Sequence, residues 1–89
     1  MKIETLTPKF VVLMPEILEP GVLYISHNFH LAIHKCACGC GYDSVTPLIP
    51  SAHGWDLVIY GDEVTLMPSI LNTPCGARYY IRRNKVEWV

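Results

Sequence analysis

The chain has 89 residues, of which 51% are apolar and 17% are charged, and its formal net charge is −1. This composition excludes a disordered chain and a coiled coil, and the near-zero charge argues against a non-specific nucleic-acid binder, which needs a basic face. A chain this short is close to the lower limit for stability by its core alone. We therefore expect a single domain over residues 1–89 that is held by something besides its core.

Prolines and glycines recur about every ten residues, which is the spacing of short strands. The strands expected in the first half are Phe10–Leu13, Val22–Ser26 and Leu31–His34, followed by an extended stretch at Tyr42–Pro50. No helical periodicity runs for long, so we expect at most single helical turns, at 16–19 and 69–72.

Two hairpins are expected in the second half of the chain. Trp55–Tyr60 and Val64–Met67 flank a Gly-Asp pair at 61–62, which has the chemistry of a tight turn. A second hairpin joins Tyr79–Arg82 to Lys85–Val89 through a turn at 83–84. The sequence thus predicts a mainly β, antiparallel domain of short strands with little or no helix.

No apolar stretch reaches the length of about 18 residues that a membrane-spanning helix needs. The apolar run Phe10–Met14 is also too short for a secretory signal. We therefore expect a cytoplasmic protein without membrane association, in which thiols stay reduced.

The basic residues gather near the end of the chain, as Arg78, Arg82, Arg83 and Lys85. Solvated positions on a hairpin explain most such clusters. The alternative is a local binding site for an anion or an acidic partner, formed by Arg78, Arg82 and Arg83.

The stretch His34-Lys35-Cys36-Ala37-Cys38-Gly39-Cys40 brings three cysteines and a histidine together, and Cys75 lies much further along. Thiolate and imidazole are zinc ligands, and zinc takes four of them in a tetrahedron. A glycine follows three of the four cysteines and allows a tight turn after each. A metal that closes so long a loop would stabilise a small domain strongly. We predict a structural zinc ion.

The one-residue gaps between the cysteines are narrower than those of common zinc motifs, so free thiols and disulfides remain alternatives. A disulfide between such close neighbours would be strained. The simplest ligand set is Cys36, Cys38, Cys40 and Cys75, with His34 as the alternative ligand.

Signs of catalysis are missing from the sequence. It contains no recognisable Ser-His-Asp order, no phosphate-binding glycine loop and no usefully spaced pair of carboxylates. A zinc ion closed by four sulfurs would also leave no position for a reacting water. We therefore expect that the protein is not an enzyme and has no catalytic residues.

Several segments resemble a small family of uncharacterised bacterial and phage proteins, over roughly residues 20–89. The family pattern is His-x-Cys-x-Cys-Gly-Cys-Gly, then Pro-Ser-Ile, then Cys-x-x-His-Tyr. The second element matches Pro68-Ser69-Ile70, and in the third element Arg78 stands where the family has histidine. If that histidine ligates metal in the family, His34 or a third cysteine fills its place here.

The resemblance implies a gene neighbourhood with bacterial multi-ubiquitin and ubiquitin-like conjugation genes, or with phages. We therefore expect a non-enzymatic, structural-zinc module that binds another protein, as an accessory of a ubiquitin-like conjugation or phage-conflict system. The alternatives are a nucleic-acid-binding zinc module and a phage-encoded inhibitor of a host defence protein. The identity of the partner and the oligomeric state stay open.

Overall fold

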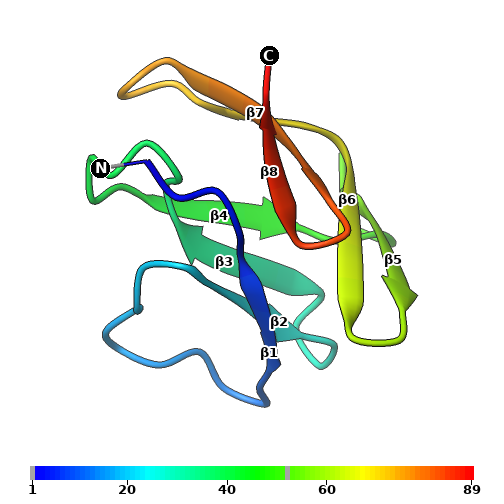
Figure 1. The fold of residues 1–89 in the computed structure, drawn as a ribbon. Coiled ribbons are helices and arrows are strands. Elements are labelled where there is room, and N and C mark those ends of the chain that lie inside the picture. The colour runs from blue at the N-terminus through cyan, green and yellow to red at the C-terminus, as the bar shows by residue number, and fades with distance from the viewer. Residues whose placement is uncertain (1, 52) are drawn as a thin grey trace.

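The computed structural model describes residues 2–51 and 53–89 as two four-stranded sheets (Figure 1). The first sheet has the order β1-β2-β3-β4, with strands Thr7–Phe10, Val22–Ser26, Leu31–Lys35 and Asp43–Pro47. The second has the order β5-β6-β7-β8, with strands Asp56–Tyr60, Glu63–Asn72, Ala77–Arg82 and Lys85–Trp88. No helix occurs among the described residues, so the predicted β class is confirmed.

The core lies between the two sheets and receives alternate side chains from each. Leu23 and Ile25 of β2 and Leu66, Tyr79 and Ile81 of the second sheet are fully buried in one cluster. Alternation of this kind buries one face of a sheet, but in β2 Tyr24 and Ser26 are buried as well, so the opposite face of that strand is also covered. Both tryptophans pack at the edge of this core, as partly buried side chains.

Short backbone links join the sheets at two further places. The end of the first sheet meets the start of the second through a bridge between Leu48 and Trp55, and the N-terminal segment reaches β8 through a bridge between Thr5 and Lys85. The two sheets therefore form one packed unit. Since the described residues form no helix, they also contain no helix that could cross a membrane.

The first strand differs from its prediction in place and direction. β1 begins at Thr7 rather than Phe10, and it pairs with β2 in parallel, whereas every other strand pair is antiparallel. Pro8, expected to precede the strand, lies inside it, as an edge strand tolerates. Val12 and Leu13, expected in the strand, are exposed in the connection that leads back to β2.

The helical turn expected at 69–72 is wrong. These residues complete β6, whose buried Ile70 pairs with the buried Tyr79 of β7. The pairing partners that β7 supplies outweigh the weak local preference of four residues after a proline. The register shifts between Leu66 and Ile70, so that residues 67–69 bulge opposite Tyr80.

Candidate functional site

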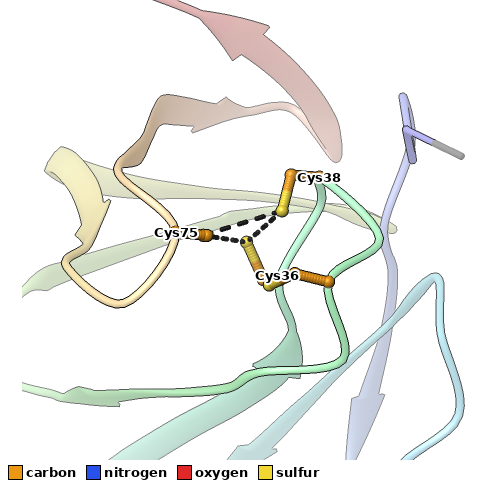
Figure 2. Close-up of side chains that lie close together, drawn as sticks. Cys36, Cys38 and Cys75 are labelled. Carbon is orange, nitrogen blue, oxygen red and sulfur yellow. Dashed lines mark hydrogen bonds between the residues drawn. The ribbon is translucent and has the colours of Figure 1, made fainter.

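The four cysteines come together from the two sheets. Cys36, Cys38 and Cys40 follow the end of β3, and Cys75 lies in the turn between β6 and β7. Figure 2 shows the thiols of Cys36, Cys38 and Cys75 turned toward one another across the gap between these loops. The predicted cluster therefore ties one sheet to the other.

The sulfur positions fit a tetrahedral metal. The Sγ of Cys36 lies 3.4 Å from that of Cys38 and 3.6 Å from that of Cys75. The Sγ atoms of Cys38 and Cys75 are also 3.6 Å apart. All four sulfurs, Cys40 included, lie within 4.8 Å of one another. Zinc–sulfur bonds of about 2.3 Å in a tetrahedron place neighbouring sulfurs about 3.8 Å apart. All four cysteines are free, and together they are able to hold a metal ion.

The glycines beside the cysteines supply the backbone turns that the sequence predicted. Gly39, Gly41 and Gly76 have φ values of 88°, 87° and 72°, in the left-handed region that favours glycine. The N–H of Tyr42, followed by the Cys38 thiol, lowers the pKa of Cys40 to about 7. Hydrogen bonds with Cys40 and then Cys36 raise the pKa of Cys38 to about 12.

His34, the alternative ligand, belongs to a buried network behind the cluster. Its Nε2 lies 2.6 Å from the Tyr79 hydroxyl, which accepts the Ala37 N–H at 3.3 Å and the Asn72 amide at 3.2 Å. With two bonds accepted, the hydroxyl has its proton left to donate to His34. Burial lowers the pKa of His34 to about 4, which keeps the ring neutral. His34 is not part of the group of four residues that could hold a metal ion.

The predicted basic site is largely neutralised. Arg82 makes an ion pair with Glu87 at 2.7 Å and packs over the Tyr80 ring, 4.1 Å from its centroid. Arg83 pairs with Glu63 at 2.9 Å. Arg78 lies on the same sheet, and in the described part of the chain no carboxylate oxygen lies within 4 Å of its guanidinium.

Two of the chain's four serines are committed to structural hydrogen bonds. The buried hydroxyl of Ser26 donates to the Val12 carbonyl at 3.1 Å, and that of Ser44 donates to the Asn72 side chain at 2.7 Å. The hydroxyls of Ser51 and Ser69 make no hydrogen bond within the described residues. Across residues 2–51 and 53–89, no serine hydroxyl is hydrogen-bonded to a histidine ring.

Ser69 occupies the bulge of β6 and is half-buried. The Trp55 indole N–H points at this bulge and donates to the carbonyls of Pro68, at 3.1 Å, and of Ser69, at 3.3 Å. Bulges often aim a side chain out of the regular ladder. The indole therefore fixes the backbone that carries the Ser69 hydroxyl.

Arg78 lies on the strand beside the one that carries Ser69. Ile70 and Tyr79 are a pair that faces the core, so their neighbours Leu71 on β6 and Arg78 on β7 face outward, and both are exposed. Leu71 pairs with Arg78, and Ser69 lies two residues before Leu71, in the bulge that has no register with β7. Both Ser69 and Arg78 fall in segments that resemble the family pattern, but their spacing in the sequence indicates no chemistry.

Comparison with known proteins gives one family. A family model described as bacterial ubiquitination-like system serine protease (BubE) matches residues 10–89. No curated protein and no solved structure matches the chain. The match supports the bacterial ubiquitin-like setting that the sequence resemblance implied.

The same match overturns the predicted function. The family is described as a serine protease, so the expectation of a non-enzymatic module, and of no enzyme activity, is wrong. The alternatives of a nucleic-acid-binding module and a phage inhibitor are not favoured either. The sequence did not indicate this activity, because none of its four serines has the surroundings by which a nucleophilic serine is usually recognised.

Proposed function

Because the chain belongs to the BubE family of bacterial ubiquitination-like system serine proteases, we propose that it is a serine peptidase that cleaves a protein substrate of such a system. The substrate is the protein partner of this chain, and its cleaved bond is an amide. The assignment to a particular serine rests on the geometry of β6 and β7.

Ser69 is the proposed nucleophile, and one observation carries this choice. In the family pattern, the serine of Pro-Ser-Ile and the histidine of Cys-x-x-His-Tyr correspond to positions 69 and 78, which lie on the neighbouring strands β6 and β7, and position 78 pairs with Leu71, two residues after Ser69. A serine and a histidine within hydrogen-bond reach are the usual pair of nucleophile and general base. Ser26 and Ser44 are less suitable as nucleophiles, because both are buried and their hydroxyls donate hydrogen bonds to Val12 and Asn72.

The proposed reaction proceeds in two steps. The Ser69 Oγ attacks the carbonyl carbon of the amide, the C–N bond breaks, and the hydroxyl proton ends on the leaving amine. Water then hydrolyses the acyl-serine ester, which releases the carboxylic acid and restores the hydroxyl. Arg78 cannot carry the proton, because a guanidinium keeps its charge at any ordinary pH. We therefore expect this chain to turn over slowly.

A structural zinc ion bound by Cys36, Cys38, Cys40 and Cys75 is the second part of the proposal. The spacing of the four sulfurs supports it, since they lie within 4.8 Å of one another and come from both sheets. Zinc would act as a closed structural centre that fixes the turn between β6 and β7. Because the thiols must stay reduced to bind the ion, we place the protein in the cytoplasm.

A fluorophosphonate probe tests the nucleophile directly, since it reacts with activated serine hydroxyls and needs no known substrate. We expect one probe adduct per chain in the intact mass, and we expect peptide mapping to locate it on Ser69. Ser69→Ala should abolish the adduct. Prolonged incubation allows for the slow reaction that Arg78 implies.

Ser51→Ala is the matched control. Ser51 is exposed, its hydroxyl makes no hydrogen bond within the described residues, and it lies two positions from a histidine, His53. Its removal should leave the adduct unchanged. No adduct after prolonged incubation, or an adduct on Ser51, would overturn the assignment to Ser69.

A further inference from the structure

Strand β5 leaves one edge of the second sheet open. It is the outermost strand of that sheet, with β6 on one side and no described strand on the other (Figure 1). Its residues Val58, Ile59 and Tyr60 are 44%, 45% and 77% exposed. An exposed apolar edge of this kind is a template for pairing with another strand.

The other edges of the two sheets carry features that usually prevent such pairing. The N-terminal segment covers β8 through the bridge between Thr5 and Lys85. β1 contains Pro8 and Lys9, and β4 ends in Pro47. Prolines and lysines are common devices against edge pairing, and β5 contains neither. The edge of β5 is therefore the one that is best suited to receive a strand.

The backbone groups of two residues on this edge are unpaired. Tyr60 and Glu63 flank a two-residue turn, so the Tyr60 carbonyl points toward β6, and so do the backbone groups of every second residue before it. The N–H and carbonyl groups of Leu57 and Ile59 therefore point away from β6. Within residues 2–51 and 53–89, these groups make no hydrogen bond on that side. Only another extended strand would satisfy them all.

The residue just before β5 shows where this open stretch begins. Trp55 has its backbone turned to the same side as Leu57, and its N–H donates to the Pro47 carbonyl at 2.7 Å. Its own carbonyl accepts the Ile49 N–H at 3.0 Å. The space beside Trp55 is thus already filled by chain, so an added strand can pair with residues 57–60 only.

A hollow next to the open stretch can accept a side chain of the added strand. Its volume is about 210 Å³, and Leu48, Ile49, Leu57 and Ile59 form its apolar lining, which two histidines and an aspartate complete. Leu57 and Ile59 lie on the core-facing side of β5, because their partners on β6 are buried. An apolar side chain on the same face of the added strand would enter this hollow.

The geometry points to a second copy of this chain as the occupant, paired through β5 in an antiparallel two-fold dimer. A pairing centred on Ile59 places this residue opposite its own counterpart, and Val58 opposite Tyr60 of the second copy. The two Ile59 residues then exchange both of their outward backbone hydrogen bonds. Each Ile59 side chain also lies at the hollow of the other copy. A two-fold axis lets one surface serve both partners in this way.

The side chains of the open stretch complement themselves. Val58 and Tyr60 form a pair of a β-branched and an aromatic residue, which is favourable across strands. The three pairs contain no charged residue, so a second copy meets no like charge there, and an acidic or basic segment would find no counter-charge. Because the interface is short, the dimer is reversible. It does not depend on the role proposed for Ser69.

Sedimentation of the full chain tests the dimer, under reducing conditions so that cysteine cross-links do not contribute. We expect the molar mass to rise toward twice that of one chain between about 10 μM and 1 mM. Ile59→Lys and Ile59→Glu should each weaken association about tenfold or more, because like charges would face each other at the two-fold axis. An equal mixture of these two variants should restore the dimer as a mixed pair.

Val45→Lys is the control, because Val45 is 54% exposed on β4, an edge strand of the other sheet, and its dimer should match that of the unaltered chain. Tyr60→Ala decides the question if both Ile59 variants misfold. It removes a side chain that is 77% exposed, and it should weaken association about fivefold. A chain that stays monomeric up to about 1 mM would overturn the inference. So would an equal loss of the dimer in Val45→Lys, unchanged association in the folded β5 variants, or a mixture that does not restore the dimer.

Discussion

At the scale of single residues, the proposed chemistry depends on which residues stand at positions 69 and 78. A serine hydroxyl is a weak nucleophile until a base takes its proton, and general-base catalysis contributes roughly 10²–10⁴-fold to such reactions. Arg78 supplies a fixed positive charge in place of a base. Position 78 therefore offers no base to the proposed Ser69 nucleophile in this chain.

Arg78→His should increase the rate of the first step. The imidazole would stand on β7 beside the strand that carries Ser69, and if Ser69 is the nucleophile with position 78 as its base, we expect fluorophosphonate labelling to become at least about tenfold faster near pH 7.5. The rate should fall below about pH 6.5, where the new histidine becomes protonated. Labelling kinetics measured between pH 5.5 and 8.5 would show both effects.

Arg82→His serves as the control for this gain. It introduces the same imidazole on the same strand, but at the turn end of the β7–β8 hairpin, where Arg82 makes an ion pair with Glu87. Its labelling rate should stay at that of the unaltered chain. An equal gain from both variants, or no gain from Arg78→His, would show that position 78 does not serve the Ser69 hydroxyl.

At the scale of elements, the residue just before β5 supports the bulge of β6. The Trp55 indole N–H bonds the carbonyls of Pro68 and Ser69 just where the ladder between β6 and β7 loses its register. A bulge without such support would leave its backbone free to shift. Small displacements of a nucleophile cost large factors in rate, so the indole acts as a positioning group.

Trp55→Phe should slow Ser69 labelling about five- to tenfold while the fold persists. The ring still packs on the core, but the N–H donor is lost, and a net hydrogen bond contributes about 1 kcal/mol. Trp88→Phe is the comparison, because Trp88 is also partly buried but lies on β8, away from the bulge. Labelling rates and thermal midpoints should be measured for both. A rate that stays unchanged in Trp55→Phe would refute the positioning role.

The elements also show which parts of the fold can be predicted from the sequence. Val22–Ser26 was predicted with both of its bounds correct, and the hairpin turn at 61–62 was placed correctly, because alternation and turn chemistry are local. The parallel pairing of β1 and the strand at 69–72 were missed, since both depend on partners distant in the chain. The four cysteines indicated a candidate metal site, because thiolates are common metal ligands. Ser69 gave no such signal, because its proposed role depends on a residue of another strand.

At the scale of the whole molecule, the cysteine cluster is a link between two sheets. Three thiols follow β3 of the first sheet, and Cys75 lies in a turn of the second. The Tyr79 hydroxyl of β7 also forms hydrogen bonds with His34 and Ala37 of the first sheet and its following loop, next to the cysteines. If the proposed zinc ion joins the sheets at this cluster, the fold should depend on it, because domains of this size have only a few kcal/mol to lose.

Removal of the metal should therefore unfold the protein or leave it barely folded. We expect elemental analysis to give one zinc per chain, and we expect chelation to lower the thermal midpoint by on the order of 20 °C or more, because about 1 kcal/mol shifts a domain of this size by roughly 4–8 °C. Cys75→Ser should reproduce the loss, since Cys75 is the second sheet's contribution to the cluster. Thr73→Ser, in the same exposed turn, should melt like the unaltered chain. A chelated protein with an unchanged melting curve would show that the cluster does not hold the two sheets together.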